Sequence, residues 1–317
     1  MSSVPIIIDC DPGIDDAIAL LSAFVSPELE ILGICAVCGN QPLARTLHNA
    51  LQITELGRRA DIPVYAGCHR PLFRDPIHGQ FHGENGLGNM RLPEPRKSAE
   101  SQHAVSFIIE QCERAAAAGK PITLCTLGPL TNLATALIMK PDIVNGIARV
   151  VMMGGAYREA GNRSLTSEFN MLADPHAAYV VFSSSLAIVA LPLDASHQVI
   201  LTPAHVARFI ALSGRISAPL GEMMAFWDRN DIRRYGSRGG PLHDPLVIAW
   251  LLAPECFQAE KARVYVEHES ELCMGQTVAD WYGKTDEQPN VDVVTRVDAE
   301  GVFALFAERL SRYEESA

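Results

Sequence analysis

Residues 4–21, VPIIIDCDPGIDDAIALL, place four aspartates within eight positions, directly after an apolar run. Ile6, Ile7 and Ile8 predict a buried strand, and the apolar residues after Asp16 predict a helix. Carboxylates this close together repel one another unless a positive charge lies among them or their pKa values rise. The stretch therefore predicts the first strand and helix of an α/β fold, with an acidic cluster at the turn between them.

Strand and helix patterns alternate along much of the remaining chain. We predict strands at Val4–Asp11, Leu29–Val37, Ile62–Ala66, Pro121–Thr126, Ala148–Met153 and Ala187–Leu191. We predict helices at Asp15–Phe24, Pro42–Arg58, Ala104–Ala117, Thr131–Ile138, Asp174–Ser183 and Leu246–Leu252. Because the strands are apolar without strict alternation, they favour an open, mainly parallel, Rossmann-like sheet with helices on both faces. We expect one domain over residues 1–317.

Polar or glycine-rich stretches follow four of the predicted strands. They are the acidic stretch 9–16, Cys38-Gly39-Asn40, Leu127-Gly128-Pro129 and Met153-Gly154-Gly155. Ligands bind beyond the carboxyl ends of parallel strands, so these stretches predict one site at that edge of the sheet. Two long segments with weak patterns, 70–100 and 159–170, are predicted to be loops that cover the substrate.

The composition argues against several classes of partner. The 317 residues carry a net charge of −11 and a pI near 5.4, which is unsuited to nucleic acid or to an anionic membrane surface. No apolar run approaches the roughly 18 residues of a membrane span, and no basic region precedes the isoleucines as in a signal peptide. We expect no nucleic-acid partner and no membrane insertion.

The eight cysteines favour unpaired thiols and a cytoplasmic location, because most of them lie in apolar segments. Cys35 and Cys38 have the spacing of a metal or redox pair. However, no second pair follows, and residues three apart on a strand face opposite sides.

The acidic stretch has two interpretations. Helix capping accounts for one or two aspartates, since a carboxylate at a helix start accepts backbone N–H groups. Capping does not account for Asp9 and Asp11 at the end of a buried strand. A hard cation does, because Ca2+ and Mg2+ bind carboxylate and carbonyl oxygens. An EF-hand is excluded, because the positions of its glycine and its glutamate hold Ile14 and Leu20.

Further polar residues lie far along the chain. Asn162 and the run Glu168-Phe169-Asn170 fall in one predicted loop, and His243-Asp244 precedes a predicted helix. Asp244 alone would be a helix N-cap, but with the first cluster it could complete an oxygen shell around a cation. His243 and His82, taken singly, are equally consistent with surface histidines.

Together these motifs resemble the nucleoside hydrolases of the inosine–uridine-preferring type. The matching stretches, in the order and spacing of that family, are Asp9-Cys-Asp11-Pro-Gly-Ile-Asp15-Asp16-Ala, Gly39-Asn40, Leu127-Gly-Pro-Leu-Thr-Asn132, Met152-Met153-Gly-Gly155, Gly161-Asn162, Glu168-Phe169-Asn170 and His243-Asp244-Pro245. The resemblance covers essentially the whole chain. It implies the nucleoside hydrolase fold and Ca2+-dependent hydrolysis of the N-glycosidic bond of ribonucleosides, which gives ribose and a free base.

The resemblance also implies residue roles. Asp11, Asp16, Asp244 and the main-chain carbonyl of Leu127 resemble the calcium ligands, and Asp11 resembles the general base that activates a calcium-bound water. Many relatives have threonine where this chain has Leu127, a difference that leaves a main-chain ligand intact. Several residues resemble contacts to the ribose hydroxyls: Asp15, Asn40, Asn170 and Asp244 for the 2′- and 3′-hydroxyls, and Asn162 and Glu168 for the 5′-hydroxyl. Met153 resembles a residue that packs against the ribose. Phe169, between Glu168 and Asn170, is a further candidate substrate contact.

The base-binding side is less determined. His243 resembles a histidine that protonates the departing base, and His82 resembles a second histidine close to it. Trp227, Arg233, Arg234 and Tyr235 could bind a base or lie on the surface, so the choice between pyrimidine and broader specificity stays open. The family implies a homodimer or homotetramer.

Three alternatives remain at this point. Asp9-Cys-Asp11 after a strand also resembles the haloacid-dehalogenase phosphatases, although Pro12 and Gly13 depart from their pattern. A second alternative is a non-catalytic, calcium-dependent nucleoside-binding protein. A third is a hydrolase of the same fold that acts on a modified or phosphorylated nucleoside, for which basic residues at 70–74 or 233–234 would be needed.

Overall fold

The computed structural model of the protein describes residues 3–79, 82–88, 90–235 and 239–314, and the side chains of these ranges except those of 227–235. The strands are β1 Val4–Cys10, β2 Leu29–Ala36, β3 Val64–Ala66, β4 Ile122–Thr126, β5 Ile147–Met153, β6 Ile188–Leu191, β7 Ile200–Leu201, β8 Gly240–Pro241, β9 Phe257–Val266, β10 Thr277–Asp280 and β11 Val291–Val297.

The α-helices are α1 Ile14–Phe24, α2 Leu43–Leu56, α3 Ala104–Ala118, α4 Thr131–Met139, α5 Phe169–Ala173, α6 Pro175–Phe182, α7 Leu193–Ser196, α8 Pro203–Leu212, α9 Ser217–Tyr235, α10 Pro245–Leu252 and α11 Ala299–Ser311. Short 3-10 helices lie at η1 Pro141–Gly146, η2 Gly214–Ile216 and η3 Pro254–Cys256.

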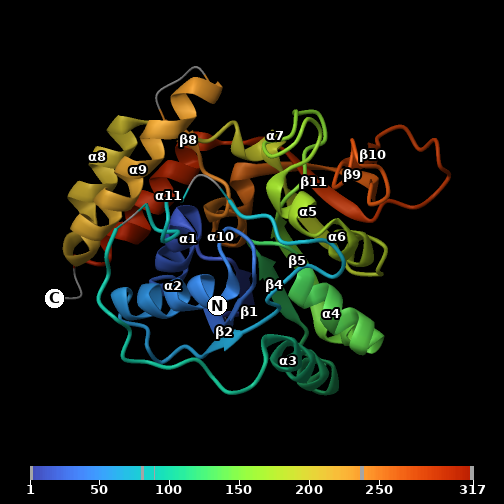
Figure 1. The fold of residues 1–317 in the computed structure, drawn as a ribbon, viewed down its shortest axis with the longest axis horizontal. Coiled ribbons are helices and arrows are strands. Elements are labelled where there is room, and N and C mark those ends of the chain that lie inside the picture. Colours follow the sequence, from blue (N-terminus) through green and yellow to red (C-terminus); the bar gives the residue numbers. More distant parts are fainter. Residues whose placement is uncertain (1–2, 80–81, 89, 236–238, 315–317) are drawn as a thin grey trace.

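One nine-stranded sheet organises the molecule, in the order β10-β9-β11-β6-β5-β4-β1-β2-β3 (Figure 1). The pairs from β11 to β3 are parallel, whereas β9 runs antiparallel to both β11 and β10. The predicted α/β class and the mainly parallel sheet are therefore confirmed. The antiparallel pairs at one end were not predicted.

Helices cover both faces of this sheet, and the first strand shows why. Ile6 and Ile8 point into one hydrophobic core, and Ile7 points into a second core on the opposite face. The first core holds residues of α1, α2, α8, α9, α10 and α11, and the second holds residues of α3, α4 and α6 (Figure 1). A strand buried on both faces has no polar side to alternate with, which explains the continuous isoleucine run.

The order of the strands places a topological switch point at the end of β1. This strand pairs with β2 on one side and with β4 on the other. The connection after β1 leads to β2 on one side, whereas the connection after β4 leads to β5 on the other side. In open α/β sheets such a switch point is where ligands bind. The acidic stretch lies there.

Most predicted boundaries lie within one or two residues of the observed ones. Three boundaries differ from the prediction. β1 ends at Cys10, so Asp11 lies beyond the strand, and α1 begins at Ile14, with Gly13 as its N-cap. α6 begins at Pro175, and the side chain of Asp174 accepts the N–H of Ala177. α3 ends as expected at Gly119, which has a φ of 63°.

The described residues contain no helix with both the length and the apolar character needed to cross a membrane. All eight cysteines, each within the described part of the chain, are free thiols.

Candidate active site

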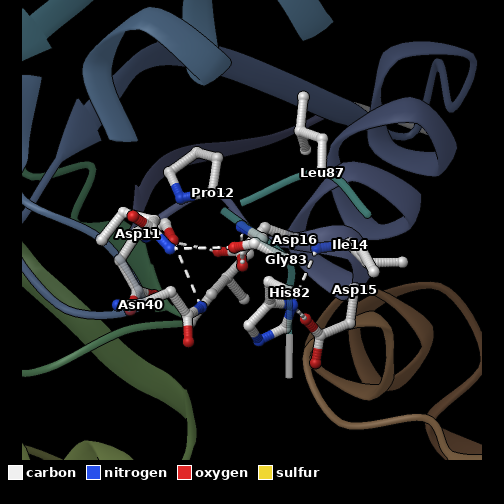
Figure 2. Close-up of polar contacts among 12 residues, drawn as sticks. Asp11, Pro12, Ile14, Asp15, Asp16, Asn40, His82, Gly83 and Leu87 are labelled. Atoms are coloured by element: carbon white, nitrogen blue, oxygen red, sulfur yellow. Dashed lines mark hydrogen bonds and ion pairs between the residues drawn. The ribbon is translucent and has the colours of Figure 1, made fainter. Parts of the chain in front are cut away.

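The turn between β1 and α1 is held by its own carboxylates (Figure 2). One oxygen of Asp16 accepts the N–H of Gly13 at 2.8 Å, and the other accepts the N–H of Asp11 at 3.3 Å. Asp16 is completely buried and lies in the first turn of α1, where the helix dipole favours a negative charge. Capping therefore accounts for Asp16, as one of the two interpretations predicted, but not for the other aspartates.

Asp11 lies in a tight polar pocket made by two neighbouring strand ends. Its Oδ2 accepts the N–H of Asn40 at 2.6 Å, and the amide of Asn40 donates to the Asp11 carbonyl at 3.2 Å. A Cβ atom on Gly39 would lie 2.1 Å from Oδ2, and one on Gly128 would lie 2.4 Å from Oδ1. The segments after β2 and β4 thus require glycine in order to approach this carboxylate.

The second oxygen of Asp11 is available for chemistry. Oδ1 has no hydrogen-bond partner, and Asp11 is only 1% exposed, so water does not reach this oxygen freely. A buried acceptor without a donor is costly unless a ligand, a water or a cation satisfies it. The carboxylate is therefore oriented by one oxygen and left with one free oxygen facing the strand ends.

A three-carboxylate group lies beside Asp11. One oxygen from each of Asp15, Asp16 and Asp244 lies within 4.8 Å of the others, and all three residues are buried. Asp244 is the N-cap residue of α10, but its side chain makes no capping hydrogen bond, so it remains free to join the group. Asp15 Oδ1 also lacks a hydrogen-bond partner.

The electrostatics of this group suit a cation. Burial raises the pKa values of Asp15 and Asp16 to about 6, and the charge of Asp15 adds to the rise for Asp16. Burial, followed by the charges of the neighbouring aspartates, also raises the pKa values of Asp11 and Asp244 well above the usual range. Four buried carboxylates, with Asp11 Oδ1 and Asp15 Oδ1 left without a hydrogen-bond partner, form an all-oxygen donor set, which fits a hard divalent ion.

The predicted ligand set overlaps this group only in part. Asp16 and Asp244 belong to both sets. Asp15, which was expected to bind the sugar, takes the third place in the observed group, while Asp11 lies next to it. The carbonyl of Leu127 accepts the amide of Asn170 at 2.7 Å, which leaves it a second lone pair for a ligand.

Asp9 does not join the acidic group, although its position in the sequence suggested a shared cation. Its Oδ1 accepts the amide N–H of Asn132 at 2.8 Å, and Asn132 in turn accepts the N–H of Cys68 at 2.7 Å. Asp9 is therefore part of a hydrogen-bonded link between β1 and the segment after β3.

The predicted sugar residues of the 159–170 segment form a connected unit. Asn162 accepts the N–H of Phe169 at 2.8 Å, and Glu168 accepts the N–H groups of Asn170 at 2.8 Å and of Gly155 at 3.2 Å. Glu168 is the N-cap of α5 and is 2% exposed, and its burial raises its pKa to about 7.

Asn170 links this unit to two strand ends. Its amide donates to the carbonyls of Leu127 at 2.7 Å and Met153 at 3.2 Å, the residues that follow β4 and end β5. The Met153 side chain is buried against it, with Sδ 3.5 Å from the same amide nitrogen. The structure thus brings together the predicted residues of the β4 end, the β5 end and α5.

The two predicted histidines neighbour different aspartates of the acidic group. His82 Nδ1 accepts the N–H of Ile14 at 3.1 Å and lies 3.9 Å from Asp15 Oδ1 (Figure 2). Burial lowers its pKa to about 4, so the ring is neutral with its proton on Nε2. His243 is adjacent to Asp244, and its Nδ1 lies 2.9 Å from the hydroxyl of Ser196.

Ser196 was missed by sequence analysis, because a lone serine in a short helix carries no motif. The side chains of Trp227, Arg233, Arg234 and Tyr235, named as possible base contacts, lie outside the described residues.

Comparison with known proteins shows the family to which this chain belongs. The model of the inosine-uridine preferring nucleoside hydrolase family matches residues 6–304. The chain belongs to this family. It is 42% identical over 313 residues to the pyrimidine-specific ribonucleoside hydrolase RihA of Salmonella typhimurium, covering 98% of this chain and 99% of the relative.

Solved structures of nucleoside hydrolases have the same fold. A purine-preferring ribonucleoside hydrolase from Gardnerella vaginalis superposes with a TM-score of 0.91 at 30% identity, covering 99% of this chain and all of the other. A plant nucleoside hydrolase superposes with a TM-score of 0.91 at 29% identity, covering 97% of this chain and 99% of the other. The predicted family and fold are confirmed, and the chain is an enzyme of the ribonucleoside hydrolase class.

Proposed function

We propose that this nucleoside hydrolase cleaves the N-glycosidic bond of pyrimidine ribonucleosides with the help of Ca2+, and that Asp11 is its general base. The observation that carries the proposal is the environment of Asp11. One of its oxygens is held by Asn40 and the other is buried and unpartnered, next to three clustered carboxylates at the switch point of the sheet.

The carboxylates of Asp15, Asp16 and Asp244 would hold the cation, with Asp11 and the Leu127 carbonyl as the further ligands that the family suggests. When bound, the cation would lower the pKa of a water molecule and hold it in place. We favour Ca2+ over Mg2+, because Ca2+ accepts irregular sets of six to eight oxygens whereas Mg2+ demands a regular octahedron.

In the proposed reaction, Asp11 Oδ1 accepts a proton from the attacking water. The water oxygen bonds to C1′ of the ribose while the bond from C1′ to the base nitrogen breaks, and the bonding pair leaves with the base. Positive charge develops on the sugar, as in other glycoside hydrolases. The buried carboxylates stabilise that charge in a site from which most water is excluded.

The sugar would be recognised through its hydroxyl groups. Asp15, Asn40, Asn170 and Asp244 would bind the 2′- and 3′-hydroxyls, and Asn162 and Glu168 would bind the 5′-hydroxyl. Met153 and Phe169 would pack against the ring. A deoxyribose would leave buried polar groups of this site without a partner, at a cost of about 1–3 kcal/mol for each group.

The base would leave on the side of the histidines. We propose that His243, held at Nδ1 by Ser196, assists the departing base with its other nitrogen, and that neutral His82 donates a hydrogen bond from Nε2. The preference for pyrimidines is supported by relatives: those at 41–42% identity with a named substrate are pyrimidine-specific, whereas the purine-preferring enzyme is 30% identical.

Release of free base from uridine, cytidine, inosine, adenosine, guanosine and 2′-deoxyuridine tests the proposal. We expect uridine and cytidine to be cleaved fastest, and 2′-deoxyuridine to react about 10⁴-fold more slowly than uridine. Faster cleavage of purine nucleosides would overturn the pyrimidine preference alone. Binding of ribonucleosides without cleavage would favour the non-catalytic binding protein or a modified or phosphorylated substrate.

Three further expectations belong to the proposal. We propose that residues 1–317 act as one domain, that the enzyme is a homodimer or homotetramer, and that it works in the cytoplasm with its thiols reduced.

A further inference from the structure

A buried asparagine of α2 connects the two sides of the site. Asn49 is 1% exposed, and its amide nitrogen donates to two carbonyls, that of Pro12 at 3.0 Å and that of Asn85 at 3.0 Å. Pro12 belongs to the turn between β1 and α1 within the acidic stretch 9–16, which we call the acidic turn. Asn85 belongs to the segment that follows His82. Asn49 itself has no role in the proposed chemistry.

The residue type suits this double contact. A carboxamide NH₂ group carries two hydrogens in a plane, so one nitrogen can satisfy two carbonyls at a set separation. Aspartate and leucine have no hydrogen to donate there, and serine has only one. The Pro12 carbonyl lies in a buried residue before the first turn of α1, where an unpaired carbonyl would be costly.

The segment His82–Gly88 is a compact turn that Asn49 contacts closely. Gly88 donates its N–H to the His82 carbonyl at 2.8 Å, and the Asn85 side chain accepts the N–H of Leu87 at 2.9 Å. Gly86 has a φ of +84°, and a Cβ atom there would lie 2.7 Å from the Asn49 amide nitrogen. The glycine lets the turn reach the asparagine.

A second link joins the same two parts. The N–H of Ile14, at the start of α1, donates to the ring of His82 at 3.1 Å. The acidic turn and the His82–Gly88 turn therefore share one contact through the histidine ring and another through Asn49. One amide nitrogen thus bonds both the Pro12 carbonyl and the Asn85 carbonyl, so a displacement of either carbonyl would strain its hydrogen bond to Asn49.

We propose that Asn49 is a positioning residue that couples cation binding at the acidic turn to the order of the His82–Gly88 turn. This inference rests on the proposed cation site. Cation binding draws the carboxylates of the acidic turn together, and Asn49 then holds the His82 side of the site in place. When the cation is bound, the hydrogen bonds of Asn49 thus keep the His82–Gly88 turn, next to the proposed base-binding region, in one conformation.

Hydrogen–deuterium exchange with and without Ca2+ tests the coupling in the full chain. In the wild type, Ca2+ should slow exchange both in a peptide covering residues 9–16 and in one covering residues 82–88. In Asn49→Leu, the slowing at 9–16 should remain, while that at 82–88 should shrink by about tenfold, as the loss of one or two buried hydrogen bonds predicts. Asn49→Ser should behave like Asn49→Leu, because one hydroxyl hydrogen cannot serve two carbonyls.

Thr54→Val is the matched control. Thr54 is a buried residue of the same helix, and its hydroxyl donates only within α2, to the Ala50 carbonyl. It should respond to Ca2+ as the wild type does. Equal Ca2+-induced slowing at 82–88 in the wild type and both Asn49 variants would overturn the coupling. Absence of slowing at 9–16 in the wild type would instead overturn the proposed cation site, so the two failures are distinguishable.

Discussion

At the scale of single residues, the environment of Asp11 distinguishes it from the aspartates around it. Asp16 caps the turn with both of its oxygens, and Asp9 is bonded to Asn132 away from the acidic group. Asp11 is held by the N–H of Asn40, and its unpartnered oxygen lies beside that group. The sequence showed which aspartates were candidates. It could not show which of them were already hydrogen-bonded, because Asn132 lies more than a hundred residues from its partner Asp9.

Asp11→Asn should lower the turnover of uridine by about 10²–10⁴-fold, because a carboxamide cannot accept the proton of the attacking water. The amide is nearly isosteric, so the circular dichroism spectrum should stay unchanged. Initial rates of base release at saturating uridine measure the effect. A rate close to that of the wild type would remove Asp11 as the base.

His243→Ala should slow the cleavage of uridine by about 10²-fold, since the leaving base loses its proton donor. Cleavage of p-nitrophenyl riboside should change much less, because p-nitrophenolate leaves without protonation. Comparison of kcat for the two substrates is the measurement. Equal losses on both would show that His243 does not act on the leaving group.

At the scale of secondary structure elements, the site is an assembly of strand ends. Apolar runs and the glycines after them predicted β1, β2, β4 and β5 to within one or two residues, and with them the edge at which the acids lie. After Leu191, the helix at Leu246–Leu252 was predicted, but the strands β7–β11 and the helices α7–α9 and α11 were not. β9 is exposed at residues 258–261, and its pairing with β10 and β11 depends on contacts that no local pattern encodes.

Some contacts of the site are also invisible to sequence. Ser196 reaches His243 from α7, and Asn49 reaches Pro12 from α2, although neither residue belongs to a recognisable motif. Such contacts arise from how helices pack on the sheet.

Gly39→Ala should abolish most activity while the protein remains folded, because the added Cβ would lie 2.1 Å from Asp11 Oδ2 and displace that carboxylate. Gly119→Ala is the control. Its Cβ would meet no atom within 4 Å, but its φ of +63° makes the substitution strained. The control should lose about 1 kcal/mol of stability and keep its activity. Paired thermal melts and uridine assays check both variants, and an active Gly39→Ala would contradict the close approach.

At the scale of the whole molecule, the buried acids link stability to pH and to the cation. Burial raises the pKa values of Asp15 and Asp16 to about 6, and those of Asp9 and Glu168 to about 7. The folded cation-free protein thus binds these protons more tightly than the unfolded chain does. Their stabilising contribution is complete below the unfolded pKa values near 4 and is lost as the pH rises through 6 to 7.

His82 has the opposite sign, because its folded pKa of about 4 lies below its unfolded value, so its contribution is lost as the pH falls below about 6.5. The four acids outweigh this single histidine. The Tm of the cation-free protein should therefore fall between about pH 5 and pH 7.5. Added Ca2+ should raise the Tm more at the higher pH, where the carboxylates are ionised. Differential scanning calorimetry at both pH values checks this, and an equal Ca2+ effect at both would argue against binding by these acids.

The most direct test of the central claim is a titration of Ca2+ into chelator-treated enzyme while uridine cleavage is followed. We predict negligible release of uracil from the chelated enzyme, and recovery that saturates at one Ca2+ per chain. Full activity after complete removal of divalent cations, or no cleavage of any ribonucleoside at saturating Ca2+, would contradict it.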